Sequence, residues 1–171
     1  ITIEDNNKMI EDFGNLFNKR TNAQKWIDKI NFAYEKFQKV VASKFEENSK
    51  QKVAYFIWAN PYMVAAGDTF INEILLKLNG LENIYDNNPK YEGRYPEVVV
   101  NKMRIQGDPD FVFLSSEPFP FKDEHAFELG RHTHHAKTIF VDGEMFSWYG
   151  SRLVKAFDYF TLLQEKLYIY K

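Results

Sequence analysis

Three of the chain's four histidines, His132, His134 and His135, fall within the stretch RHTHHAK. Imidazole nitrogens bind Zn²⁺ or Cu²⁺ and serve as general bases near neutral pH. The cluster is therefore a candidate for a metal site or for an active site. Spacings of one, two and three residues cannot place all three rings on one helix face, and no acidic side chain adjoins them. The stretch also separates a predicted helix from a predicted strand. This favours a solvated connection without metal ligands, with a histidine-cluster metal-binding protein as the alternative.

Two carboxylates, Glu117 and Glu144, lie just after predicted strands and are candidates for acid–base chemistry. They could pair with His134 or His135 in a hydrolase-type or other α/β enzyme, or accept hydrogen bonds from the amides of a ligand. Glu144 could also simply cap the terminal helix. Ser115–Ser116 lack a surrounding G-x-S-x-G, and the chain has no P-loop and no G-x-G-x-x-G, so nucleophilic catalysis and nucleotide binding have no sequence support.

Aromatic side chains gather in the loops that we expect at one edge of the fold. Taken singly, such residues belong to a core more often than to a binding surface. Taken together, they suit an aromatic-lined concavity for a flat organic ligand. The candidates are Trp58, Tyr62, Tyr95, Phe119, Phe146 and Trp148.

The composition is that of a folded globular protein with room for one ordinary core. The 171 residues are 44% hydrophobic and 17% aromatic, with a net charge of -2. Without a basic stripe, nucleic acid is not an expected partner. Without cysteine, disulfides and thiolate metal sites are excluded. No apolar run reaches the ~20 residues of a membrane span.

Residues 1–48 form a predicted helical segment. Thr2 and Asp5 have the spacing of a helix cap, and apolar residues then follow at helical intervals. Residues 22–45 continue without Gly or Pro and place Trp26, Ile30, Phe37 and Phe45 at helical spacing. This helix is longer than the ~11–12 residues typical of globular proteins. A helix of that length is expected to span between parts of a protein.

Residues 49–171 alternate short strands with helices, which predicts a three-layer α/β/α lobe with a mostly parallel, Rossmann-like sheet. The runs 52–58, 110–116 and 137–142 read as buried strands. Asp68 is the expected cap of a helix that Gly80 closes. In such folds ligands bind at the carboxyl ends of the strands, which selects the loops 58–62, 115–119 and 142–146.

An ordered series of motifs carries a family resemblance. Gly67, Asn79–Gly80 and Glu82-Asn83-Ile84 follow the first predicted strand, and RYPEVVVNKM, DPDFVFLSS and AKTIFVDGEMFSWYGSRL come after them. The series resembles the second lobe of class III (helical-backbone) substrate-binding proteins of ABC importers, which bind cobalamin, iron–siderophores or haem. The resemblance covers the chain but only the later part of the family's length. It implies that residues 22–45 are the interdomain helix, that the N-terminal lobe is absent, and that the chain alone binds weakly.

The resemblance also implies roles for particular residues. Trp58 and Tyr95 match pocket aromatics, Glu144 matches an acidic pocket residue and Phe146 an adjacent aromatic. Where the family has a glutamate that docks onto the permease, this chain has Asn101, with Glu97 one helical turn earlier.

The function implied is that of a non-enzymatic solute-binding component of an ABC importer. It captures a metal chelate, with cobalamin first and an iron–siderophore or haem second, and delivers it to a membrane permease. Such a protein is periplasmic or a cell-envelope lipoprotein, monomeric, without a resident cofactor, and meets the membrane only through its permease or a lipid anchor.

Overall fold

The computed structural model describes residues 2–44 and 50–169. The chain groups into two compact units, residues 1–46 with 145–171 and residues 47–144. The sequence predicts a different division, with residues 1–48 as a helical segment and 49–171, including the terminal helix, as the α/β lobe. This division into domains stays a prediction. Within the described ranges, no helix is both long and apolar enough to cross a membrane.

The first unit is built from long helices. They are α1 (Ile3–Leu16), α2 (Arg20–Lys44) and α6 (Leu153–Ile169), with the short turn η3 (Gly150–Arg152) before α6. The predicted cap is confirmed: the Thr2 side chain accepts from the Asp5 N–H and the Asp5 carboxylate accepts from the Thr2 N–H. The long helix is also confirmed over 25 residues, although Phe45 lies outside the described residues. Phe37 of α2 packs on Phe157 of α6, with ring centroids 5.7 Å apart.

The second unit holds a mostly parallel sheet. Its strands are β1 (Gln51–Trp58), β2 (Met63–Val64), β3 (Leu81–Asn83), β4 (Phe111–Ser115) and β5 (Lys137–Val141). The path runs β2-β1-β4-β5, with β3 also paired to β1. β1 is parallel to β3 and β4, β4 is parallel to β5, and the short β2 runs antiparallel to β1. Parallel pairing brings the carboxyl ends of β1, β4 and β5 to one edge.

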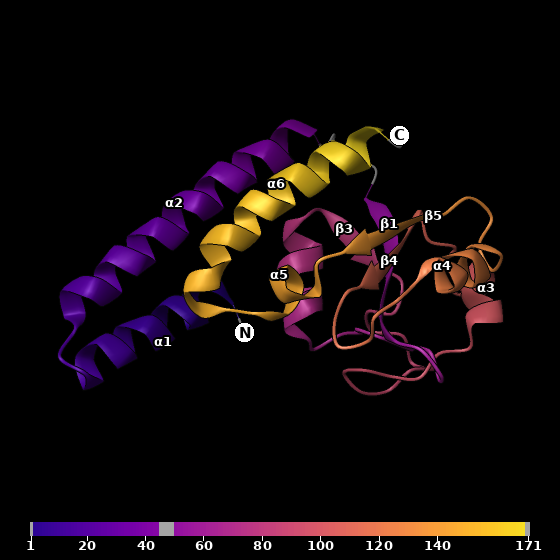
Figure 1. The fold of residues 1–171 in the computed structure, drawn as a ribbon, viewed down its shortest axis with the longest axis horizontal. Coiled ribbons are helices and arrows are strands. Elements are labelled where there is room, and N and C mark those ends of the chain that lie inside the picture. Colours follow the sequence, from indigo (N-terminus) through magenta and orange to yellow (C-terminus); the bar gives the residue numbers. More distant parts are fainter. Residues whose placement is uncertain (1, 45–49, 170–171) are drawn as a thin grey trace. The chain divides into compact units, whose positions relative to one another are not determined.

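Helices lie on both faces of this sheet, so the predicted α/β fold class is confirmed. Figure 1 shows α3 (Met103–Gln106) and α4 (Asp123–Gly130) on one side of the strands and the helix over 70–78 on the other. That helix contains the π-helical turn η1 (Ile71–Leu76), and η2 (Val100–Lys102) leads into α3. Alternate residues of β1 and β4 point into the core beneath α3 and α4. That core includes Ala54, Phe56, Val112, Leu114, Met103 and Leu129.

Two local predictions are wrong. β5 is not a buried strand: among the described strands it pairs with β4 alone, so most of its side chains keep contact with solvent and Phe140 is 49% exposed. Asp68 does not cap the helix over 70–78. Thr69 does so instead, because its hydroxyl accepts the Asn72 N–H at 3.0 Å, while Asp68 adopts a positive φ just before it. Gly80 closes this helix as predicted, with φ of 71°.

Candidate functional site

The loops that follow β4 and β5 meet at the carboxyl edge of the second unit, as the sequence predicts. The Ser116 N–H donates to the Val141 carbonyl at 3.0 Å, and the Gly143 N–H donates to Ser116 Oγ at 3.0 Å. Gly143 suits this position because a Cβ there would collide with Ser115 Oγ and lie 2.9 Å from the Glu117 nitrogen. The close approach fixes the loop that carries Glu117 beside the loop that carries Glu144.

Trp58 and Phe119, two of the predicted aromatics, come together at this edge. Trp58 ends β1 and Phe119 follows β4, and their ring centroids are 5.4 Å apart at 63°. Phe119 in turn lies 4.9 Å from Phe121. Trp58 is 40% exposed, so the cluster presents an aromatic surface to solvent. We call Trp58 and Phe119 the aromatic face; Phe121 lies buried in the core next to Phe119.

Tyr62, another of the predicted ligand contacts, makes two contacts within the second unit. Its ring packs edge-on against Phe56 of the core, at 5.7 Å, and its hydroxyl donates to Glu128 Oε2 of α4 at 2.6 Å. Burial, and then the hydrogen bond to Glu128, raise the pKa of the Tyr62 hydroxyl above its ordinary value of 10.0. Tyr62 therefore fastens the turn after β1 to α4.

We expect Tyr62→Phe to lower the free energy of unfolding by about 1 kcal/mol, since one solvent-accessible hydrogen bond is lost and the ring contact stays. A raised folded-state pKa stabilises the fold below the unfolded pKa, and this contribution disappears as pH rises above about 10. The difference between wild type and variant should therefore shrink in urea unfolding at high pH. A constant difference from pH 7 to about 10.5 would contradict this role.

The two candidate carboxylates differ in their surroundings. Glu117 is exposed, while Glu144 is half-buried in the first turn of α5 (Gly143–Ser147). The Glu144 N–H donates to Asp142 Oδ1 at 3.0 Å. Glu144 does not cap the terminal helix, because that helix begins only at Leu153. Both carboxylates thus belong to the edge that carries the aromatic face.

Two predicted contacts belong to the first unit. Phe146 is fully buried, with its ring 4.9 Å from Phe160, so the structure gives it a core position rather than an exposed one. Burial follows because the residue packs on α6 instead of remaining in an open loop. Trp148 is 49% exposed, and the Arg152 guanidinium lies 4.9 Å from the centre of its ring.

Tyr95 and the predicted docking residues lie on the long loop and the turn that lead to α3. Tyr95 is 41% exposed, with the Arg94 guanidinium 5.9 Å from its ring centre. Glu97 and Asn101 are both exposed. Glu97 also forms an isolated antiparallel bridge with Met63, which ties this loop to β2.

The histidine cluster lies at the opposite edge of the sheet, as predicted. It forms the connection from α4 into the amino end of β5. His135 Nε2 lies 2.9 Å from Asp110 Oδ1, and the His134 N–H donates to Asp108 Oδ1 at 3.2 Å. In the part of the chain that the structure describes, no group of three or more His, Asp or Glu side chains could hold a metal ion. These residues fasten the connection to the start of β4.

The fourth histidine, His125, is the site residue that sequence reasoning missed. It stands at the third position of α4, and its Nδ1 accepts the Lys122 N–H at 3.0 Å. Its ring lies 5.2 Å from Phe119 and 5.5 Å from Phe121. The available signal was its place three residues after Lys122, the N3 position where a capping box usually has Glu or Gln.

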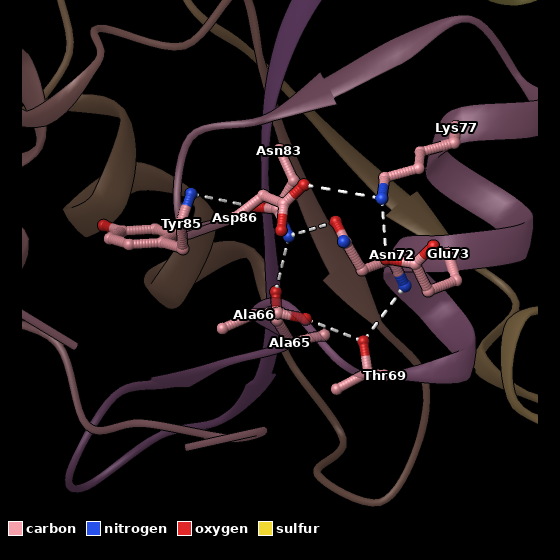
Figure 2. A network of polar contacts seen from close by, with 9 residues as sticks. All are labelled: Ala65, Ala66, Thr69, Asn72, Glu73, Lys77, Asn83, Tyr85 and Asp86. Atoms are coloured by element: carbon pink, nitrogen blue, oxygen red, sulfur yellow. Dashed lines mark hydrogen bonds and ion pairs between the residues drawn. The ribbon is translucent and has the colours of Figure 1, made fainter. Parts of the chain in front are cut away.

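A buried polar network supports the chain just before the helix over 70–78 (Figure 2). Asn83 Nδ2 donates to the Ala65 carbonyl at 2.8 Å and to Asn72 Oδ1 at 3.0 Å, while Asn83 Oδ1 accepts the Tyr85 N–H at 3.1 Å. The Thr69 hydroxyl donates to the Ala66 carbonyl at 2.8 Å. Asn83 thereby joins β3, the segment after β2 and the helix over 70–78.

Comparison with known proteins identifies the fold. No family model matches the chain, and no curated protein matches it in sequence. Among solved structures, a possible iron-binding periplasmic solute-binding protein of Staphylococcus epidermidis aligns over 98% of this chain and 63% of its own, with 18% identity and a TM-score of 0.73. The periplasmic heme-binding protein BhuT, in complex with two hemes, aligns over the same shares with 16% identity and a TM-score of 0.73.

A third structure, the periplasmic vitamin B12 binding protein BtuF of Vibrio cholerae, aligns over 96% of this chain and 62% of its own, with 16% identity and a TM-score of 0.70. At these identities the likeness is one of fold. This chain spans about three-fifths of the length of these structures. The chain therefore shares its fold with part of the class III periplasmic solute-binding proteins.

Proposed function

We propose that the chain belongs to the solute-binding component of an ABC importer, which captures a metal chelate outside the cytoplasm and delivers it to a membrane permease. The observation that carries the proposal is the half-exposed aromatic face beside Glu117 and Glu144, at the carboxyl edge of a sheet whose fold periplasmic solute-binding proteins share. Ligands of open α/β sheets bind at this edge. The protein acts by binding, not by catalysis.

The chemistry of the edge favours a flat chelate rimmed with amides. Trp58 and Phe119 would cover an apolar ligand face, and Glu117 and Glu144 would accept hydrogen bonds from amide N–H groups. A ligand rimmed with carboxylates would meet like charges here. A corrinoid such as cobalamin is therefore our first choice, with an iron–siderophore or haem second. The metal reaches the protein already held by its chelator.

The rest of the transport cycle follows from the same proposal. Exposed Glu97, two residues after Tyr95, and exposed Asn101, four residues later, are our candidates for contact with a basic surface of the permease. Tyr95 and Trp148, both partly exposed, remain candidate ligand contacts. The protein would act as a monomer in the periplasm or as a lipoprotein of the cell envelope.

The experiment that tests the proposal is an absorption titration of the full-length protein with cyanocobalamin, hemin and a ferric siderophore. We expect a saturable change with one of them, and cyanocobalamin before the others. If all three spectra equal the sum of protein and free chelate at every ratio, the proposal is wrong. Free Zn²⁺ and Cu²⁺ serve as a separate arm, and stoichiometric binding of either ion without a chelator would favour a histidine-cluster metal site instead.

We expect Trp58→Ala to weaken binding of the preferred chelate about tenfold, because an aromatic anchor of a binding surface is lost. The matched control is Trp26→Ala: Trp26 on α2 is 41% exposed, almost the same as Trp58, but lies in the first unit. Quenching of tryptophan fluorescence by the chelate measures both affinities. Equal weakening by the two substitutions would show that the aromatic face has no special role.

A further inference from the structure

His125 combines two contacts that fix its orientation. Its ring stands edge-on to Phe119 and Phe121, with interplanar angles of 89° and 88°. Its Nδ1 accepts the Lys122 N–H, which closes the first turn of α4. The imidazole is thus held at the border of the aromatic face by two rings and a backbone hydrogen bond.

This hydrogen bond assigns the tautomer. An Nδ1 that accepts a hydrogen bond carries no proton, so the proton of the neutral ring is on Nε2. Among residues 2–44 and 50–169, Nε2 has no protein partner, and the imidazole is only half-buried. Nε2–H is therefore available as a donor. While the cap is intact, Nε2 has no lone pair with which to bind a metal.

The charges around His125 define the acceptor that it suits. Between Glu117 and Glu128 the chain carries four carboxylates, and Lys122 is the one cationic side chain. A carboxylate on a ligand would be repelled by this surface, whereas a neutral carboxamide oxygen accepts a hydrogen bond without that cost. The same amide groups carry the N–H donors that Glu117 and Glu144 would accept.

We infer that His125 is a ligand-contact residue that donates its Nε2–H to a carboxamide oxygen at the rim of the chelate lying on the aromatic face. The inference rests on the proposed function and adds a specificity residue to it. In this role His125 distinguishes ligands by the polar groups at their rim and does not coordinate the metal.

Two substitutions separate this role from the structural one. Glutamine and glutamate are the usual residues at the third position of a capping box, so His125→Gln and His125→Glu both keep an acceptor for the Lys122 N–H. Only glutamine also keeps an N–H donor. Both variants lose the ring contacts with Phe119 and Phe121 equally, so we expect them to unfold at the same urea concentration as each other.

The readout is the affinity of the full-length protein for cyanocobalamin, measured by calorimetry. We expect His125→Gln to bind within about threefold of wild type and His125→Glu about tenfold more weakly, the effect of one lost hydrogen bond that leaves a buried acceptor unpaired. His125→Glu binding as tightly as wild type would overturn the inference and leave the proposed function standing. Loss of binding in His125→Gln would also overturn the inference. It would indicate that His125 coordinates the metal, a role that the amide of glutamine cannot fill. Absence of cyanocobalamin binding by wild type would overturn the inference as well, and absence of binding to hemin and a ferric siderophore in addition would overturn the proposed function.

Discussion

Replacing Asn83 by alanine is expected to lower the free energy of unfolding by about 3 kcal/mol. The side chain is 5% exposed and makes three hydrogen bonds, to the Ala65 carbonyl, Asn72 Oδ1 and the Tyr85 N–H (Figure 2). Alanine leaves these buried groups without that partner, and each buried polar group left unpaired costs ~1–3 kcal/mol. Urea unfolding followed by circular dichroism measures the change.

The control for this prediction is Asn88→Ala. Among the described residues, Asn88 Oδ1 accepts one hydrogen bond, from the Lys90 N–H in the exposed loop after β3, so we expect a loss below about 0.5 kcal/mol. Asn83→Asp provides a further check, because a carboxylate can accept from Tyr85 but cannot donate to Ala65 and Asn72. If Asn83→Ala and Asn88→Ala unfold at the same urea concentration, the network does not stabilise the fold as argued.

Gly143→Ala is expected to be similarly costly, at about 3 kcal/mol, the upper end of the range for overpacking. The new Cβ would overlap Ser115 Oγ and lie 2.9 Å from the Glu117 nitrogen, so the loops after β4 and β5 would have to move apart. The Gly143 N–H would then lose Ser116 Oγ as its acceptor. Because these loops carry Glu117 and Glu144, we also expect chelate binding to weaken.

Gly130→Ala is the matched control, since a Cβ there would meet only Thr138 Oγ1, at 3.9 Å, which is ordinary van der Waals contact. Gly130 closes α4, and we expect its replacement to leave the free energy of unfolding within about 0.5 kcal/mol of wild type. Equal unfolding midpoints for wild type and Gly143→Ala would contradict the close approach of the two loops.

Much of the fold follows from sequence patterns that are local. Thr2 and Asp5 predict the start of α1, and the absence of Gly and Pro after residue 21 predicts the length of α2. The run 52–58 predicts β1 within one residue. Parallel order then places Trp58 and Phe119 at one edge, since Trp58 ends β1 there and Phe119 follows the end of β4. Their contact was predictable from topology without any knowledge of side-chain packing.

The wrong predictions concern burial and capping, which depend on contacts between residues that are distant in the sequence or on the local backbone turn. Lys137–Val141 reads as a buried strand, but its exposure depends on having one partner strand rather than two, which no local pattern records. Asp68 and Thr69 are both good cap residues, and the backbone turn at Asp68 selects the second. Phe146 and Trp148 lie two residues apart in the same aromatic run, yet packing on α6 buries only Phe146. His125 was not predictable from its local pattern, because Lys122 and His125 are not the Ser or Thr and Glu or Gln of a usual capping box.

Isothermal titration of full-length protein with cyanocobalamin tests most directly whether this edge captures a metal chelate. We expect one ligand bound per protein with a dissociation constant of about 1 μM or lower, and about tenfold weaker binding in Trp58→Ala, with Trp26→Ala unchanged. Hemin and a ferric siderophore, titrated in parallel, identify the preferred class. No binding heat with any of the three chelates, or equal affinity in wild type and Trp58→Ala, would contradict the account.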